Sequence, residues 1–170
     1  MKYLYLYFLV VFSFSISLFA QNENQRPCSS PEATQFDFWV GEWELAWSDK
    51  NGNNQTGTNS ITKILNGCVI EENFKGGSFI GRSLTVYNPN KKVWQQTWVD
   101  NSGGYLEFSG GFVDDQIILS REFRTKDNKK VKQRMIFYNI TKNKIDWNWE
   151  KSLDDVKTWQ LAWKIHYARK

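Results

Sequence analysis

From residue 43 onward, the chain is a series of ten short apolar-rich runs separated by turn-forming residues. The clusters between the runs are rich in Gly, Asn, Asp and Pro, which accept turn geometry readily. No connection is long enough for the crossover helix that parallel strands require. We therefore predict an antiparallel meander with strands over residues 43–47, 56–65, 68–74, 79–87, 93–100, 106–112, 116–123, 130–139, 144–151 and 158–167.

A meander of this size has no helix layer to cover it, so it must close on itself or pack as two sheets. We predict an all-β fold, a ten-stranded antiparallel up-and-down barrel. Ser29, Pro31 and Glu32 form a helix-start signal, which predicts a short helix over residues 31–38. Phe36 and Trp39 would face inward from it, so the helix would plug one end of the barrel.

The first twenty residues are predicted to be a signal peptide and not part of the fold. Lys2 is followed by an uncharged, mostly apolar run that ends in Ala20. This pattern is typical of a secretory leader. An uncleaved membrane anchor is the alternative, because the run is close to the length of about 20 residues that a span needs. We expect residues 21–29 to be a flexible segment and residues 30–170 a single domain, exported to the periplasm or the medium without stable membrane insertion.

Charge and cysteine content limit the possible partners. Without Lys2 the chain has 21 basic and 18 acidic side chains, a balance too even to indicate nucleic-acid binding. Cys28 and Cys68 are the two cysteines, and in an oxidising compartment they could form a disulfide. Two free buried thiols are the alternative. The chain offers too few ligands for a metal site, and we expect no cofactor.

Turn chemistry predicts which face of the sheet is inside. If residues 101–103 form a three-residue hairpin loop with Gly103 in the left-handed conformation, Trp98 pairs with Leu106 and Gln96 with Phe108. One face then becomes strongly apolar, as burial requires. The even spacing within the tryptophan pairs 94/98, 147/149 and 159/163 predicts that each pair shares a face.

The same alternation places polar side chains among the inward-facing aromatic rings. A buried carboxylate or guanidinium is costly unless it is paired. One interpretation is a closed network in which Glu72 pairs with Arg121. The other is a cavity with a few polar groups among aromatic walls, as in small-molecule sites. The predicted ligand-binding residues are Glu72, Ser83, Thr85, Tyr87, Gln96, Trp98, Asp100, Phe108 and Arg121.

No catalytic motif is present: the sequence has no Gly-x-Ser-x-Gly, no His-Glu-x-x-His and no phosphate-binding glycine loop. We therefore predict no catalytic residues and a non-catalytic barrel that binds a small hydrophobic or amphipathic molecule. One alternative is a hydrolase- or isomerase-like enzyme that uses cavity carboxylates such as Glu72 and Asp100. Another is a structural or protein-interaction barrel with a filled core. Neither the ligand nor the oligomeric state follows from the sequence.

Five blocks of the chain resemble a family of uncharacterised secreted bacterial proteins of calycin type, related to lipocalins, fatty-acid-binding proteins and nitrobindins. The blocks are residues 36–43, 65–74, 81–83 with 87–89, 94–104 and 157–159. The resemblance implies a ten-stranded barrel with a helical plug and an interior cavity, and no established activity. Nitrobindins hold haem through a histidine on the final strand. Here the single histidine, His166, alternates with Ile165 and Tyr167 and is expected to face outward, so we do not expect haem binding.

Overall fold

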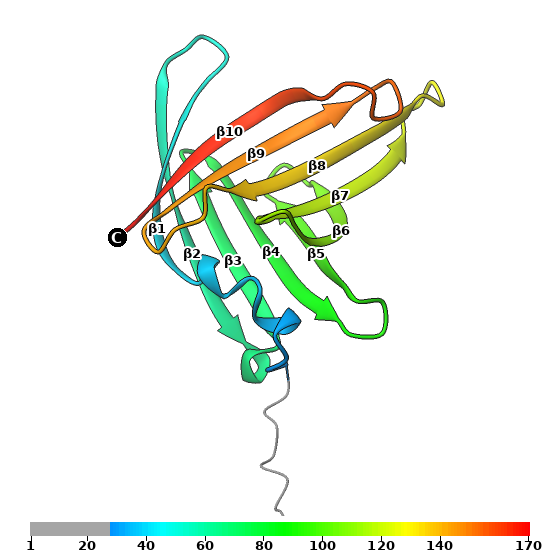
Figure 1. Ribbon diagram of the computed structural model, residues 1–170. Coiled ribbons are helices and arrows are strands. Elements are labelled where there is room, and N and C mark those ends of the chain that lie inside the picture. The colour runs from blue at the N-terminus through cyan, green and yellow to red at the C-terminus, as the bar shows by residue number, and fades with distance from the viewer. Residues whose placement is uncertain (1–27) are drawn as a thin grey trace, which may run out of the picture.

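Residues 28–170 form a closed ten-stranded antiparallel barrel in a computed structural model (Figure 1). Each strand pairs with the next along the chain, and β10 pairs with β1. The predicted fold class is confirmed, whereas the predicted signal peptide and residues 21–27 lie outside the described residues. The elements are η1 Glu32–Thr34, η2 Asp37–Trp39, β1 Gly41–Ser48, β2 Asn54–Ile64, η3 Leu65–Gly67, β3 Val69–Gly76, β4 Phe79–Asn88, β5 Val93–Asp100, β6 Tyr105–Val113, β7 Gln116–Arg124, β8 Lys130–Tyr138, β9 Lys144–Ser152 and β10 Gln160–Arg169.

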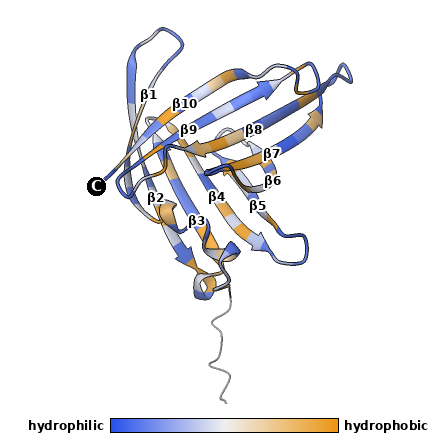
Figure 2. Ribbon diagram, in the orientation of Figure 1, coloured by the Kyte–Doolittle hydropathy of each residue, from blue (hydrophilic) through white to orange (hydrophobic). Residues whose placement is uncertain are grey.

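Hydrophobic and hydrophilic residues alternate along the strands (Figure 2), which follows from the two-residue period of a β-strand. The predicted register of the β5–β6 hairpin is confirmed: Trp98 pairs with Leu106 and Gln96 with Phe108. Gly103 has φ of 82°, in the left-handed region that the three-residue loop requires. The inner face deduced from turn chemistry is therefore correct at this hairpin.

The predicted plug is present, but it is wound more tightly than an α-helix. Two 3₁₀ turns, η1 and η2, replace the single helix expected over residues 31–38. In a 3₁₀-helix, residues three apart lie in line, and Ala33, Phe36 and Trp39 are the residues of this segment that are buried. The Ser30 hydroxyl, next to the serine of the start signal, accepts a hydrogen bond from the Ala33 amide at 3.3 Å, whereas the residue that precedes η1 is Pro31.

The plug packs into the barrel through edge-to-face aromatic contacts. The Phe36 ring lies 4.8 Å from the Trp94 ring and 5.5 Å from the Phe137 ring, between centroids, and the Trp39 ring lies 5.1 Å from that of Phe137. Such pairs contribute about 0.5–1.5 kcal/mol each beyond the burial of their surface. The plug end of the barrel is thus filled with rings, and any internal space must lie beyond it.

All neighbouring strands of the sheet are paired near the plug, but two neighbouring pairs, β6 with β7 and β1 with β10, separate toward the other end of the barrel. β6 and β7 pair only from Ser109↔Ser120 to Val113↔Gln116, and β1 and β10 pair only from Trp43↔Arg169 to Ala46↔His166. Beyond these pairs the strands of each couple diverge. The barrel therefore opens as two halves, β1–β6 and β7–β10, which are visible in Figure 1.

One predicted tryptophan pair is wrong. β10 begins at Gln160 and not at Thr158, because the Thr158 amide and hydroxyl both donate to Asp154 in the preceding turn. A β-bulge between Leu161 and Trp163 then shifts the alternation. As a result, Trp159 lies under the Arg134 guanidinium, 3.9 Å from the ring centroid, whereas Trp163 faces the interior.

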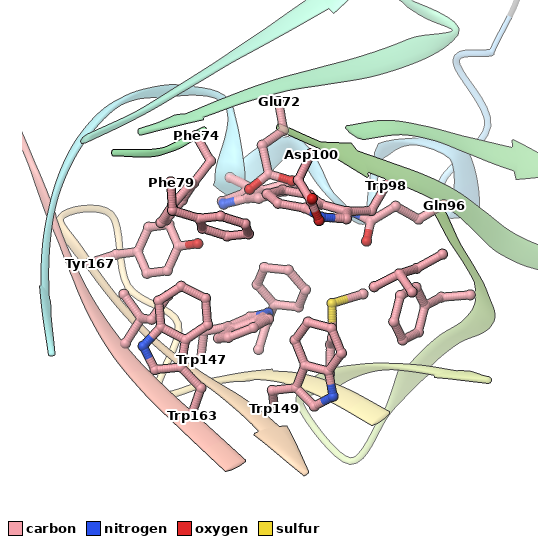
Figure 3. Close-up of a pocket in the computed structure, with 16 residues that line it drawn as sticks. Glu72, Phe74, Phe79, Gln96, Trp98, Asp100, Trp147, Trp149, Trp163 and Tyr167 are labelled. Atoms are coloured by element: carbon pink, nitrogen blue, oxygen red, sulfur yellow. The ribbon is translucent and has the colours of Figure 1, made fainter. Parts of the chain in front are cut away.

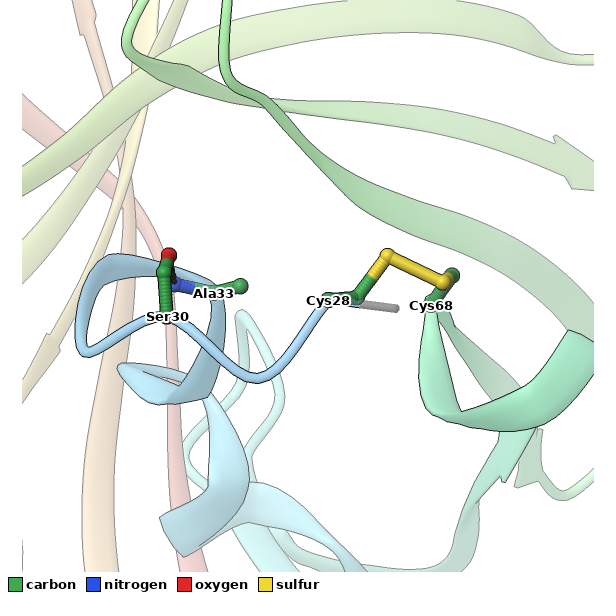
Figure 4. Close-up of a disulfide and its surroundings, with 4 residues drawn as sticks. All are labelled: Cys28, Ser30, Ala33 and Cys68. Atoms are coloured by element: carbon green, nitrogen blue, oxygen red, sulfur yellow. Dashed lines mark hydrogen bonds between the residues drawn. A yellow bond between two sulfur atoms is a disulfide. The ribbon is translucent and has the colours of Figure 1, made fainter. Parts of the chain in front are cut away.

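Cys28 and Cys68 are joined by a disulfide, with the Cα atoms 5.1 Å apart (Figure 4). The bond links the segment just before η1 to the end of η3. Of the two alternatives for these cysteines, the structure has the bonded one. The plug is thereby tied covalently to the β2–β3 connection.

Arg169, the last residue of β10, holds the plug at its other end. Its guanidinium donates hydrogen bonds to the carbonyls of Lys142 at 2.6 Å, Val40 at 2.8 Å and Phe38 at 3.0 Å. The guanidinium also lies 4.1 Å from the centre of the Trp43 ring system. Gly41 leaves room for this arrangement: its φ is 138°, and a Cβ there would collide with Arg169 Nη1.

We expect Arg169→Ala to lower the free energy of unfolding by about 2 kcal/mol, because hydrogen bonds from a charged donor contribute about 1.5–3 kcal/mol each and water replaces part of this at a half-exposed site. Lys170→Ala, which removes a neighbouring charge, should have little effect. Chemical denaturation of the three proteins measures both changes. Equal losses in the two variants would mean that the charge, and not the contact with the plug, is responsible.

Candidate functional site

A cavity of about 270 Å³ lies between the two halves of the barrel (Figure 3). Most of its walls are aromatic, and its polar groups are few, which is the usual composition of a small-molecule site. Its volume exceeds the roughly 150 Å³ of an apolar cavity that accepts benzene. The lining residues are Trp39, Glu72, Phe74, Phe79, Gln96, Trp98, Asp100, Leu106, Phe108, Met135, Phe137, Trp147, Trp149, Trp163, Ile165 and Tyr167.

Glu72 on β3 is the buried acid of this cavity. Its carboxylate accepts hydrogen bonds from Asn59 Nδ2 at 2.7 Å and from the Ser83 hydroxyl at 2.6 Å. Burial raises the pKa of Glu72 to about 7, although both hydrogen bonds favour the charged form. The carboxyl group therefore changes its charge close to neutral pH.

Two further polar groups accompany Glu72. The Tyr167 hydroxyl accepts a long hydrogen bond of 3.4 Å from Asn59 Nδ2, and burial and the nearby Glu72 charge raise the pKa of Tyr167. Trp39 Nε1 is buried, makes no well-formed hydrogen bond within residues 28–170, and lies near enough to the Tyr167 hydroxyl to lower the pKa of Tyr167 slightly against these effects. Buried donors without a well-formed partner are rare in folded proteins, so the indole can offer this donor to a bound molecule.

Asp100 occupies a different position, at the end of β5, and serves the hairpin loop. Its carboxylate accepts hydrogen bonds from the amides of Ser102 and Gly104, at 2.9 and 3.0 Å, and from Trp98 Nε1 at 3.0 Å. Hydrogen bonds from the Ser102 and Trp98 side chains are the largest of the effects that lower the pKa of Asp100 to about 2. It stays ionised at neutral pH and fixes the edge of the Trp98 indole.

The structure groups most of the predicted ligand-binding residues but gives them different positions. Ser83 and Thr85 are buried behind the lining, where Gln96 Nε2 donates to Thr85 at 2.9 Å and to Ser83 at 3.3 Å. Phe108 is part of the wall. Tyr87 lies toward the plug beside Trp94, with 5.6 Å between ring centroids, and does not line the cavity.

Arg121 does not reach the cavity or pair with Glu72. Its guanidinium lies 4.6 Å from the Phe123 ring centroid and 5.7 Å from that of Phe108, and it lines an outer groove at the opening between β6 and β7. Arg121 is on the face of β7 that the alternation predicted. However, β7 has already separated from β6 at this position, so the side chain lies at the opening between the two strands. The predicted Glu72–Arg121 network is therefore wrong, and Asn59 and Ser83 take its place.

Sequence reasoning missed Asn59 and much of the aromatic wall as site residues. Asn59 shares the inner face of β2 with Ile61, so the two-residue period of that strand could have identified it. Trp147 lies nearly perpendicular to Trp149 and to Trp163, at 89° and 87°. The Trp147–Trp149 contact lies within β9, where the even spacing predicted a shared face, whereas the Trp147–Trp163 contact joins β9 to β10 and no signal within one strand predicts it.

The predicted outward orientation of His166 is confirmed. Its side chain is 55% exposed, and Nδ1 lies 2.6 Å from Asp146 Oδ1 on the neighbouring strand. Within the described residues, no group of three or more His, Cys, Asp and Glu side chains is placed to hold a metal ion. The helical turns of residues 28–170 are also too short to cross a lipid bilayer.

Comparison with known proteins gives a family but no activity. Residues 30–169 match the model of a family described as "Protein of unknown function (DUF1579)". No curated protein matches the chain. The function must therefore be inferred from the cavity.

Proposed function

We propose that this chain, which belongs to the DUF1579 family, binds a small, partly apolar molecule inside its barrel. One observation carries the proposal: a cavity of about 270 Å³ has mostly aromatic walls and only a few polar groups. Among these groups, the Glu72 carboxylate can accept hydrogen bonds, the Tyr167 hydroxyl can accept or donate one, and Trp39 Nε1 can donate one. Apolar walls with a few polar groups that fix orientation are what recognition of such a molecule requires.

Thermal melting against a ligand panel tests this proposal. The panel comprises medium-chain fatty acids, haem, and aromatic amines, alcohols and carboxylic acids. A ligand at a hundred times its dissociation constant stabilises the native state by about 2.7 kcal/mol. For a domain of this size we expect the melting temperature to rise by about 5–10 °C.

Two matched variants locate the binding. Leu106→Trp enlarges a wall residue and should abolish the shift, whereas Leu84→Trp makes the same change at an exposed position of β4 and should preserve it. If no panel compound stabilises the native protein, the proposal fails. If Leu84→Trp and Leu106→Trp both keep the shift, the ligand binds outside the cavity.

We also propose that the protein is exported and related to calycins. The uncharged run after Lys2 and the Cys28–Cys68 disulfide both support export, because disulfides persist in oxidising compartments. The closed ten-stranded meander supports the calycin relationship.

An intact-mass measurement on the protein recovered from its host tests the export proposal. We expect a chain that begins at Gln21, and a retained leader would contradict it.

Proton-transfer catalysis is a second candidate, favoured by the near-neutral pKa of Glu72. Glu72 could remove a proton from a carbon acid held against the aromatic wall, as an isomerase does. Asp100 is a poor partner acid because its pKa is lowered to about 2. Deuterium uptake from heavy water into any panel compound, lost in Glu72→Gln, would favour catalysis, and no uptake would favour simple binding.

A further inference from the structure

The acidic and aromatic groups of the cavity are arranged on opposing walls. Figure 3 shows the Glu72 and Asp100 carboxylates on one wall and the rings of Trp147, Trp149 and Trp163 across the cavity from them. Within the described part of the chain, no Lys, Arg or His lines this space. The charged groups that face a ligand there are therefore only acidic.

The aromatic rings form a rigid enclosure with faces in several directions. The Trp163 ring lies nearly perpendicular to those of Trp147, at 87° and 5.8 Å, and Phe74, at 81° and 5.8 Å. Phe74 in turn meets Trp98 at 65° and 6.0 Å. The face of an aromatic ring is electronegative and attracts cations, and cages of such rings recognise organic ammonium groups.

Glu72 has capacity left for a ligand. The protein gives each of its oxygens one hydrogen bond, from Asn59 and from Ser83, whereas an ionised carboxylate has about four acceptor sites. A buried carboxylate without a cationic partner is costly. A cationic ligand would supply that partner and additional donors together.

We propose that the ligand is a small organic ammonium ion that carries an aromatic or other apolar group, an inference that rests on the proposed binding function. Its ammonium donates to Glu72, and its apolar part lies against the indole rings. Asp100, which also lines the cavity and is ionised, adds to the attraction for a cation. The volume suits a molecule of about one or two rings, since about 150 Å³ suffices for benzene.

Calorimetry with a matched series tests the charge preference at pH 8. The series is 2-phenylethylamine, 2-phenylethanol and 3-phenylpropionate, together with tryptamine and the corresponding indole alcohol and acid. We expect each amine to bind at least about tenfold more tightly than its alcohol, and each carboxylate to bind most weakly. If an alcohol or a carboxylate binds as tightly as its amine, the inference is wrong, although the cavity would still be a binding site.

Variants of two adjacent glutamates assign the effect to Glu72. Glu72→Gln keeps the shape and should weaken 2-phenylethylamine binding at least about tenfold while leaving 2-phenylethanol within about threefold. Glu71→Gln removes a charge from the neighbouring position of β3, on the opposite face, and should leave both affinities unchanged. Equal amine affinity in Glu72→Gln and the native protein would overturn the inference.

The pH dependence gives an independent readout. Tyr167 is the titratable group that contacts the Glu72 network, and Asp100 is the other acid of the cavity. Neither group titrates between pH 5.5 and 8.5: Tyr167 stays neutral because its pKa is raised, and Asp100 stays ionised because its pKa is lowered to about 2. Alkylammonium groups titrate near about 10.4, so amine affinity should rise across this range as Glu72 ionises. A flat profile would contradict the proposal, and failure of the whole ligand panel would remove the proposed function as well.

Discussion

Replacing Cys28 and Cys68 by serine will lower the free energy of unfolding by about 4 kcal/mol. The bond spans a sequence separation of 40 residues, and in the chain-entropy account a loop of that length restricts the unfolded chain by about 4 kcal/mol. The loop contains the plug, β1 and β2. For a domain of this size, we expect the melting temperature to fall by about 8–16 °C.

Reduction of the native protein provides the control. Melting with a strong reductant should reproduce the loss seen in the double serine variant, and the reductant should not change the melting of the variant itself. A variant as stable as the native protein would show that the disulfide does not contribute to stability. A native protein insensitive to reductant, with a destabilised variant, would point to packing of the two side chains and not to the bond.

Local signals were sufficient for the fold and for most of its inner face. The hairpin at residues 101–103 requires one left-handed residue, and Gly103 supplies it, so the register of β5 and β6 followed from the turn. The alternation then placed Gln96, Trp98 and Phe108 correctly. Register and burial reinforce each other here, because a shift of one residue would expose the whole apolar face.

The failures occur where a strand departs from regular pairing. The β10 bulge moved Trp159 to the outer surface, and the divergence of β6 from β7 left Arg121 in a groove beside Phe108. Both departures arise in the pairing of one strand with its neighbour, β9 with β10 and β6 with β7, and the alternation within a single strand does not reveal them. The composition of the site was therefore predictable in part, whereas the partner of Glu72 was not.

The plug illustrates the same limit at smaller scale. A serine and a proline predicted a helix near the right place, but the choice of 3₁₀ winding depends on the barrel. Ala33, Phe36 and Trp39 must all face one hydrophobic end, and a period of three residues achieves this. Tertiary packing thus overrides local helix preference in short segments.

Replacing Glu72 by glutamine will stabilise the protein above neutral pH. The free energy of unfolding of the variant, minus that of the native protein, will be about 3 kcal/mol larger there than at pH 4. The pKa of Glu72 is about 7 in the folded state, against 4.5 for a solvent-exposed glutamate such as that of the unfolded chain. Between these values the folded protein holds a proton that the unfolded chain has released, so stability falls as pH rises through this window. A difference of 2.5 units corresponds to about 3 kcal/mol.

Chemical denaturation from pH 4 to pH 9 measures this change. Glutamine has the same shape and is always neutral: it can accept from Asn59, while the Ser83 hydroxyl can rotate to accept from it. The difference between Glu72→Gln and the native protein should grow from pH 4.5 to pH 7 and then stay constant, and Glu71→Gln should give a flat difference. A flat difference for Glu72→Gln as well would mean that the folded barrel already compensates the buried charge. A cationic ligand would then have no unpaired carboxylate to neutralise.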